Sequence, residues 1–186
     1  MNGLFFNSRN SPTFAQVTNS SSSPVISVVQ AQNAATNGKY YIMTTGIISI
    51  PKSGFMCIQI SNPIDSASNL HLNRITAGTD AATEGFILFG ATFSDAGTVI
   101  VPINSNANYS SVKSSMNCKY IASASNPTTG GTVLTTLVTP TTGGFYDLQF
   151  PDIFIVGPGG ILYLKFQNDT NLTINNIFLN MGWWED

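Results

Sequence analysis

Apolar and polar residues alternate with a period of two along most of the chain, and this pattern limits the possible folds more than any other feature. Over residues 161–167, Leu162, Leu164 and Phe166 fall on one side, and the residues between them fall on the other. Such alternation is typical of a β-strand with one buried face. We therefore predict that these three side chains lie in the core.

A second alternating run follows the polar tip at 168–171. Leu172 and Ile174 share one face, but the parity then slips by one, because the next apolar residues to share a face are Ile177, Leu179 and Met181. A slip of one residue turns every later side chain to the opposite face, so the pattern predicts a β-bulge at 175–176. We expect the two runs to form a hairpin, with Leu172 and Ile174 in the core.

Strand patterns of this kind recur from residue 40 to the end of the chain. They predict strands at 40–50, 54–61, 69–76, 86–93, 97–103, 117–124, 132–139, 145–156 with a break at Pro151, 160–167 and 171–184. No window holds a helical period over three turns, and Gly and Pro interrupt every stretch. Eight to ten strands separated by turn residues predict an all-β antiparallel sandwich, and a jelly-roll β-sandwich fits this number best.

The first 39 residues differ from the predicted sandwich domain at 40–186. A Ser-rich tract precedes a single apolar run, whose members are Val25, Ile26, Val28 and Val29. Two interpretations remain open. The run is either an edge strand of the same sandwich, behind a frayed terminus, or part of an extended arm that pairs with the sheet edge of a neighbouring subunit. In the second case these four residues belong to an assembly interface.

The composition favours close packing between copies of the chain. Only 9% of the residues are charged, and polarity comes instead from 20 Ser, 20 Thr and 19 Asn. An uncharged polar surface gives little long-range repulsion between subunits. The seven Lys and Arg residues are scattered singly, so no nucleic-acid partner is expected. No stretch reaches the roughly 18 apolar residues of a membrane span, so no membrane association is expected either.

Residues that commonly carry catalysis or bind metals are sparse. His71 is the single histidine, and it lies between Leu70 and Leu72 on the opposite, solvent side of its predicted strand. A single histidine cannot form a metal site with several histidine ligands, and it leaves His71 as the one candidate base for a Ser-His catalytic triad. Two acidic pairs, Asp80 with Glu84 and Asp147 with Asp152, are possible carboxylate or calcium sites, but turn acids are common without such a role. We expect no catalytic residues, no cofactor and no metal.

The two cysteines leave two alternatives. Met56, Ile58 and Ile60 share the expected core face of their strand, which places Cys57 on the other face. Without a secretory signal, reduced thiols packed as small apolar groups are the expected state of Cys57 and Cys118. A disulfide between them, or between subunits, is the alternative.

Aromatic residues suggest a different binding function. Sandwich proteins commonly bind glycans through exposed aromatic side chains, and candidates for such a platform are Tyr109, Phe145, Tyr146, Tyr163, Trp183 and Trp184. Adjacent strand residues point to opposite faces, so the two tryptophans cannot share one platform. The parity predicts Trp183 inward and Trp184 outward. A subunit contact is the preferred role for Trp184, because large aromatic residues are favoured at interfaces.

Several short motifs resemble segments of phage and prophage virion proteins. Near the C-terminus these are "VGPGGILYLKF", "NDTNLTINN" and "GWWED", and in mid-chain "LHLNRITAGTD". The likeness covers residues 40–76 and 150–186. It implies a jelly-roll structural subunit displayed on a virion, such as a head, neck, appendage or decoration protein, and it implies no catalytic residues. The insertion at 104–131, the apolar N-terminal run and the two cysteines are not part of the pattern.

The resemblance agrees with the first residues, MNGLFFNSRNSPTF, which lack a basic segment followed by a sustained apolar run, so that no secretory signal is expected there. A phage protein is made in the host cytoplasm, assembles with copies of itself and with other particle proteins, and leaves by lysis. We therefore expect a structural subunit located in the virion. A spore or cell-surface filament subunit is the second hypothesis, a carbohydrate-binding module that recognises a surface glycan is the third, and an enzyme is the least favoured.

Overall fold

The computed structural model describes residues 3–6, 12–15, 30–93, 96–140, 142–170 and 174–186. Side chains are described from Gln30 onward, except that of Asp152. The short strands β1 (Gly3–Phe6) and β2 (Pro12–Ala15) pair with each other in antiparallel fashion. The apolar run at 25–29 and Leu172 lie outside the described residues, so the predictions for them stay predictions.

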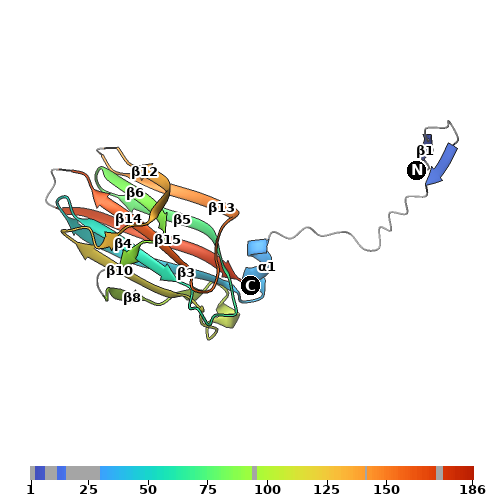
Figure 1. Cartoon of the computed structure of the whole chain (residues 1–186), viewed down its shortest axis with the longest axis horizontal. Coiled ribbons are helices and arrows are strands. Elements are labelled where there is room, and N and C mark those ends of the chain that lie inside the picture. Colours follow the sequence, from blue (N-terminus) through green and yellow to red (C-terminus); the bar gives the residue numbers. More distant parts are fainter. Residues whose placement is uncertain (1–2, 7–11, 16–29, 94–95, 141, 171–173) are drawn as a thin grey trace.

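The body of the molecule is an all-β antiparallel sandwich, as predicted (Figure 1). One sheet has six strands, in the order β12 (Thr132–Val138), β6 (Thr83–Phe89), β14 (Ile161–Asn168), β4 (Phe55–Ser61), β10 (Asn117–Ser123) and β8 (Thr98–Ile100). The other has five, in the order β13 (Gly144–Val156), β5 (Leu70–Thr79), β15 (Ile174–Glu185), β3 (Tyr40–Pro51) and β9 (Ile103–Asn104). A separate pair joins β7 (Thr92–Phe93) to β11 (Thr128–Thr129), and a single 3₁₀ turn, η1, spans Ala107–Tyr109.

Successive strands mostly change sheets along the chain. β3, β5, β13 and β15 lie in the five-stranded sheet, whereas β4, β6, β12 and β14 lie in the six-stranded one. In the sequence, β8, β9 and β10 lie between β6 and β12. In space, β10 and β8 extend the six-stranded sheet beyond β4, and β9 extends the five-stranded sheet beyond β3. The predicted hairpin of the last two strands is therefore wrong, because β14 pairs with β4 and β6 while β15 pairs with β3 and β5.

The hydrophobic core fills the space between the two sheets. Leu162, Leu164 and Phe166 are buried there, as the alternation predicted. The largest fully buried side chains come from both sheets and include Trp183, Met43, Ile50, Met56, Ile58, Ile60, Leu70, Leu72, Ile75 and Ile87. Each sheet buries one of its faces against the other sheet, so every second residue of a strand points into the core. This arrangement explains why apolar residues recur with a period of two.

The predicted inward position of Ile174 and the bulge at 175–176 are both wrong. Ile174 is 57% exposed, and the register with β3 is regular from Ile174 to Phe178. The inward position belongs to Asn175, which is fully buried. Its Nδ2 donates to Thr83 Oγ1 at 2.8 Å, and its Oδ1 accepts from the Asp80 N–H at 3.2 Å. A buried asparagine with satisfied hydrogen bonds thus takes the inward position that the apolar pattern assigned to Ile174.

The irregularity against β3 lies further along β15. The register changes between Phe178 and Asn180, where the intervening residue of β15 faces both Thr45 and Gly46 of β3. Gly46 has a φ of 64°, a left-handed conformation that glycine adopts without strain. Thr45 Oγ1 accepts the N–H of Leu179 at 3.0 Å, which replaces the missing ladder bond. The bulge therefore lies in β3 rather than in β15.

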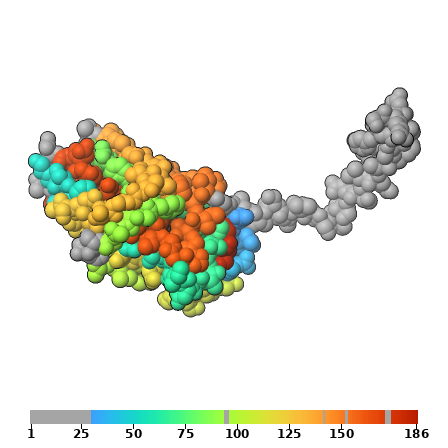
Figure 2. Space-filling view, in the orientation of Figure 1, coloured from blue at the N-terminus to red at the C-terminus, as the bar shows by residue number. Residues whose placement is uncertain are grey.

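A short helix, α1 (Gln30–Thr36), lies within the segment predicted as an arm or edge strand. Ala34 is buried against the body, and Gly38 ends the helix with a φ of 69°. Figure 2 shows α1 against the C-terminal residues of β15. At this end of the molecule, α1 thus contacts both β15, the last strand, and β3, the first strand of the sandwich.

Candidate assembly surface

An apolar row crosses the outer face of the five-stranded sheet. Phe145 of β13 pairs with Gly78 of β5. Gly78 pairs on its other side with Phe178 of β15, which pairs in turn with Ile47 of β3. Phe145 is 63% exposed and Ile47 is 74% exposed, whereas Phe178 is half-buried. We refer to Phe145, Gly78, Phe178 and Ile47 as the apolar row.

Gly78 allows the two phenylalanine rings to meet across β5. A Cβ atom on Gly78 would lie 2.3 Å from Cε1 of Phe178, closer than non-bonded atoms approach. The Phe178 ring therefore occupies the space above Gly78, and its centroid is 6.3 Å from that of Phe145. The row borders a shallow hollow of about 320 Å³. Neighbouring aromatic and β-branched side chains thus form a continuous apolar surface across four strands.

Charged groups near the row are hydrogen-bonded within the chain. Arg74 donates two hydrogen bonds of 2.8 Å to the Asp147 carboxylate, and these bonds lower the pKa of Asp147. Asn176 Nδ2 donates to Asp80 Oδ2, also at 2.8 Å. Asp147 therefore forms an ion pair with Arg74. The side chain of Asp152, which the sequence had suggested as its partner, lies outside the described part of the structure. The apolar row is therefore bordered by polar groups that are hydrogen-bonded to one another.

Over β6 and β14, the outer face of the other sheet is covered by the chain itself. Leu88, Ala91 and Tyr163 are buried there in a second, smaller apolar cluster. Phe93 of β7 packs on Tyr163, with ring centroids 6.0 Å apart, and Lys119 Nζ lies 4.9 Å from the Phe93 ring centroid. The two faces of the sandwich therefore differ, because this one carries a packed cover and the face with the apolar row is open.

A second exposed apolar strip follows one side of the sandwich. The segment from β8 to β9 leaves the edge of the six-stranded sheet and joins the edge of the five-stranded sheet. Val99, Val101 and Ile103 are exposed at alternate positions along it. Residues two apart in an extended segment share one face, so these three side chains form a ridge toward solvent.

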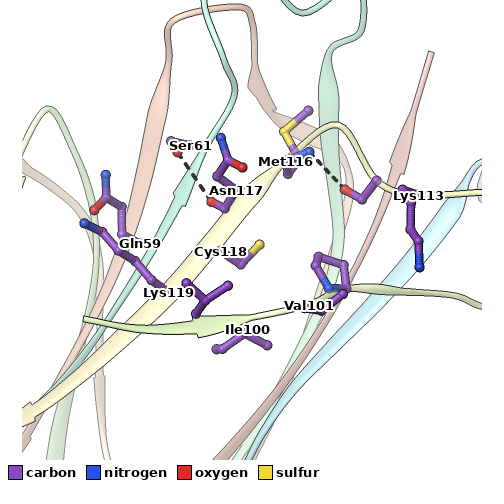
Figure 3. Close-up of a pocket in the computed structure, with 12 residues that line it drawn as sticks. Gln59, Ser61, Ile100, Val101, Lys113, Met116, Asn117, Cys118 and Lys119 are labelled. Carbon is purple, nitrogen blue, oxygen red and sulfur yellow. Dashed lines mark hydrogen bonds between the residues drawn. The ribbon is translucent and has the colours of Figure 1, made fainter. Parts of the chain in front are cut away.

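Behind this ridge lies the hollow drawn in Figure 3, with a volume of about 470 Å³. It opens where β8 separates from β10 after the pair Ile100–Cys118. Its walls combine apolar and polar side chains, namely Gln59, Ser61, Val99, Ile100, Val101, Pro102, Lys113, Ser114, Met116, Asn117, Cys118 and Lys119. In the described part of the chain, no group of three or more His, Cys, Asp and Glu side chains lies close enough to hold a metal ion.

Trp184 and His71 lie on the face away from the main core, as predicted, but they stack on each other instead of being exposed there. Their ring centroids are 3.6 Å apart and their planes are 7° from parallel. Trp184 is only 9% exposed and His71 only 8%, so neither side chain is free at the surface. His71 Nε2 also lies 3.1 Å from Asp186 Oδ2. Trp184 does face away from the main core, but its own chain covers it, so a subunit contact through this ring is not supported.

The preceding and following residues complete a C-terminal clamp. Trp183 is fully buried in the main core, as predicted. Its indole N–H donates to Glu185 Oε1 at 2.9 Å, and the Ser115 N–H donates to Glu185 Oε2 at 3.0 Å. The Ser114 hydroxyl is a third donor to this buried carboxylate. The closing "WWED" motif therefore fastens the end of β15 to neighbouring loops.

The two cysteines lie on opposite faces of the six-stranded sheet, so the suggested disulfide between them does not form. Cys118 pairs with Ile60 in β4 and points into the main core, whereas Cys57 pairs with Ile121, three residues along β10. An odd separation along paired strands places side chains on opposite faces. Both thiols are free and buried, and burial raises the pKa of each to about 12.

The aromatic residues considered for a sugar platform are dispersed. Tyr163 is buried under Phe93, and Trp183 lies in the main core. Tyr146 packs against the core from β13, on the opposite side of that strand from Phe145. Tyr109 packs on Gly38 beside α1. The structure therefore does not bring these residues together on one surface.

Comparison with known proteins gives one finding. A family model matches residues 13–186, almost the whole chain. The chain belongs to the family of unknown function DUF6143. No curated protein and no solved structure matches it. Among the described residues, no helix is long and apolar enough to cross a membrane. Because the family description states no activity, a functional proposal for this DUF6143 protein depends on its surface.

The apolar row was not predicted as a site, although part of its signal is in the sequence. Leu179 and Met181 mark the inward parity of the last strand, which places Phe178 outward. The alignment of Phe178 with Gly78 and Ile47 depends on register between strands far apart in the sequence. That register is not readable from one strand at a time.

Proposed function

We propose that this DUF6143 protein is a non-enzymatic structural subunit that assembles with copies of itself, first of all in a phage-type virion. The observation that carries the proposal is the apolar row on an open sheet face. Scattered exposed apolar residues are normal on a soluble protein, but a contiguous strip of them usually marks an interaction surface. Here Phe145, Phe178 and Ile47 are adjacent across neighbouring strands.

The low charge of the chain supports the same proposal. Only 9% of all residues are charged, and the Arg74–Asp147 pair neutralises two charges beside the row. Copies of such a surface repel each other little at close range. Interface cores are characteristically depleted of charged residues and enriched in aromatic ones.

The order of the strands adds a proposal about the fold. Without β8, β9 and β10, the sheets read β12-β6-β14-β4 and β13-β5-β15-β3. Eight strands in two four-stranded sheets, with most connections passing from one sheet to the other, are what we expect of a jelly roll. Jelly rolls form viral capsid domains and lectins alike. A jelly-roll fold would therefore suit a virion subunit.

Within this proposal the protein is made in the host cytoplasm and becomes part of the particle, as a head, neck, appendage or decoration protein. A subunit of a spore or cell-surface filament would need the same assembly surface and is the second candidate. Labelling purified particles with an antibody against the chain separates the two. Labelled heads or tails support the virion, and labelled filaments without heads support the alternative.

The assembly surface is tested by replacing the two most exposed members of the row, Phe145 and Ile47, by serine. We expect the double variant to remain folded but to form smaller assemblies than the unmodified protein at equal concentration. Ile64→Ser is the control, because Ile64 is at least as exposed as the two replaced residues but lies in the loop between β4 and β5. Equal assembly of the double variant and the control would contradict the role of the row.

A further inference from the structure

The edge strand β12 has features of a strand that pairs with a second copy of itself. Exposed sheet edges offer unpaired backbone groups, and proteins usually protect them. β8 and β9 are short, with three and two residues. β13 carries Pro151, and its register with β5 is interrupted between Gln149 and Phe154. Proline discourages the addition of another strand to an edge, because it has no backbone N–H to donate.

β12 lacks the protection that charge or proline gives. It spans seven residues, Thr132–Val138, none of them charged or proline. No charged residue occurs anywhere between Lys119 and Asp147. Val133, Leu134 and Val138 are exposed. An uncharged edge rich in Val, Leu and Thr combines strong β-propensity with exposed apolar side chains, which are the conditions for edge-to-edge pairing.

The sequence around β12 is the same in both directions. Residues 132–139 read TVLTTLVT, so an antiparallel copy presents the same order of side chains. Antiparallel pairing about a two-fold axis places residues of the same sheet face opposite each other. In a regular strand, Val133 and Val138 would point to opposite faces, because they are an odd number of residues apart. In a regular strand, this eight-residue palindrome would therefore not allow Val133 of one copy to lie opposite Val138 of the other on the same face of the sheet.

A bulge in β12 removes this obstacle. Val133 pairs with Leu88 of β6, and Thr135 pairs with the next residue, Ile87, so Leu134 is an extra residue. Val138 pairs with Glu84. Leu88 and Glu84 are four residues apart on one strand and share a face, so Val133 and Val138 share that face too. The bulge thus makes the palindromic strand compatible with two-fold symmetry.

We propose that two copies of the protein pair through β12 in antiparallel fashion, with the two-fold axis at Thr136. In this arrangement Val133 lies opposite Val138 of the second copy, and Thr136 lies opposite its own equivalent. The six-stranded sheets of the two copies become one continuous sheet. Contacts of this kind are isologous, because each copy contributes the same patch.

A second copy is the occupant that this edge fits best, because the match is between the strand and itself. Val133 and Val138 gain an apolar partner each, and no charge is placed opposite a like charge across the axis. The inference rests on the proposed function, since it names one contact by which copies of the subunit assemble. It is separable from the apolar row, which lies on the other sheet.

Cross-linking of the full-length chain tests the pairing directly. Thr136→Cys should give a disulfide-linked dimer under mild oxidation, because directly opposite residues lie within disulfide reach. The native thiols Cys57 and Cys118 are buried and do not compete. Thr98→Cys, on the exposed edge strand β8, is the matched control and should stay monomeric on a denaturing gel. Circular dichroism checks that both variants are folded.

A charge pair provides a second, independent measurement. Thr136→Lys and Thr136→Glu should each abolish the β12 contact, since like charges then meet at the axis, and mixing the two variants should restore it. If the unmodified protein assembles but Thr136→Cys does not cross-link, self-pairing is wrong while the proposed function stands. If Thr136→Lys disrupts assembly without Thr136→Cys cross-linking, β12 binds a different segment, and self-pairing is again wrong. A monomer under all conditions contradicts both proposals.

Discussion

The Phe178 ring lies across Gly78, where a Cβ atom would come within 2.3 Å of it. Gly78→Ala should therefore displace the half-buried Phe178 ring and lower the free energy of unfolding by roughly 1 kcal/mol, the low end of the cost of overpacking, because the ring can move toward solvent. Chemical denaturation measures this loss. Gly157→Ala is the control, because a Cβ there has ordinary contacts and no left-handed φ. Equal stability of the two variants would show that Phe178 is not held over Gly78.

Two apolar residues near the C-terminus should respond differently to truncation. Phe166 is buried in the core, and Phe166→Ala should lower the free energy of unfolding by about 3–5 kcal/mol. Ile174 is exposed on the outer face, so Ile174→Ala should change it by less than about 1 kcal/mol. Urea unfolding of both variants checks the assignment of faces. A large loss for Ile174 would restore the original prediction that this residue is in the core.

The buried thiols predict a dependence of stability on high pH. Burial raises the pKa of Cys57 and of Cys118 from an ordinary value of 9.0 to about 12. Between these values the unfolded chain loses both protons while the folded chain keeps them, so stability should fall as pH rises through this range. Thermal unfolding across the range measures the slope. A variant with both cysteines replaced by alanine should show a shallower slope, and an identical slope would contradict the assignment.

The same burial should make both thiols unreactive in the folded protein. Alkylation by iodoacetamide near neutral pH requires the thiolate, which a raised pKa suppresses. Mass spectrometry should therefore find no alkylation of the folded chain and complete alkylation of the unfolded chain. Rapid reaction of the folded chain would contradict the buried positions of Cys57 and Cys118.

The positions of the strands were predictable because a sandwich strand has one buried face. The predicted strands at 40–50, 54–61 and 160–167 correspond closely to β3, β4 and β14. The break at Pro151 corresponds to the interruption of register in β13. These features depend on residues within a single strand, so the sequence of each strand was sufficient to predict them.

Features that depend on partners in distant strands were not predictable. The inward position of Asn175 depends on hydrogen bonds with Thr83 and Asp80, almost a hundred residues earlier. The stacking of His71 on Trp184 likewise depends on the pairing of β5 with β15. α1 is only seven residues long, too short for a periodic signal, and packs through Ala34 against the body. Such short elements depend mainly on tertiary contacts.

Of the two interpretations of the apolar run at 25–29, the one in which it pairs with a neighbouring subunit makes a testable prediction. Replacing Ile26 and Val28 by aspartate should weaken assembly, because charged side chains disfavour the addition of a strand to a sheet edge. Light scattering at several protein concentrations measures the effect. Ser21→Asp with Ser23→Asp in the preceding Ser tract is the control for added charge. Unchanged assembly of the Ile26 and Val28 variant would mean that this run takes no part in subunit contacts.

The central claim is that the protein works as a repeated subunit, and the mass of the full-length protein in solution tests it most directly. Sedimentation velocity over a wide range of concentrations gives this mass without labels. We predict assemblies larger than one chain whose population grows with concentration, as mass action requires, and which shrink when Phe145 and Ile47 are replaced by serine. A single species with the 19.8 kDa mass of one chain at every concentration would contradict the account.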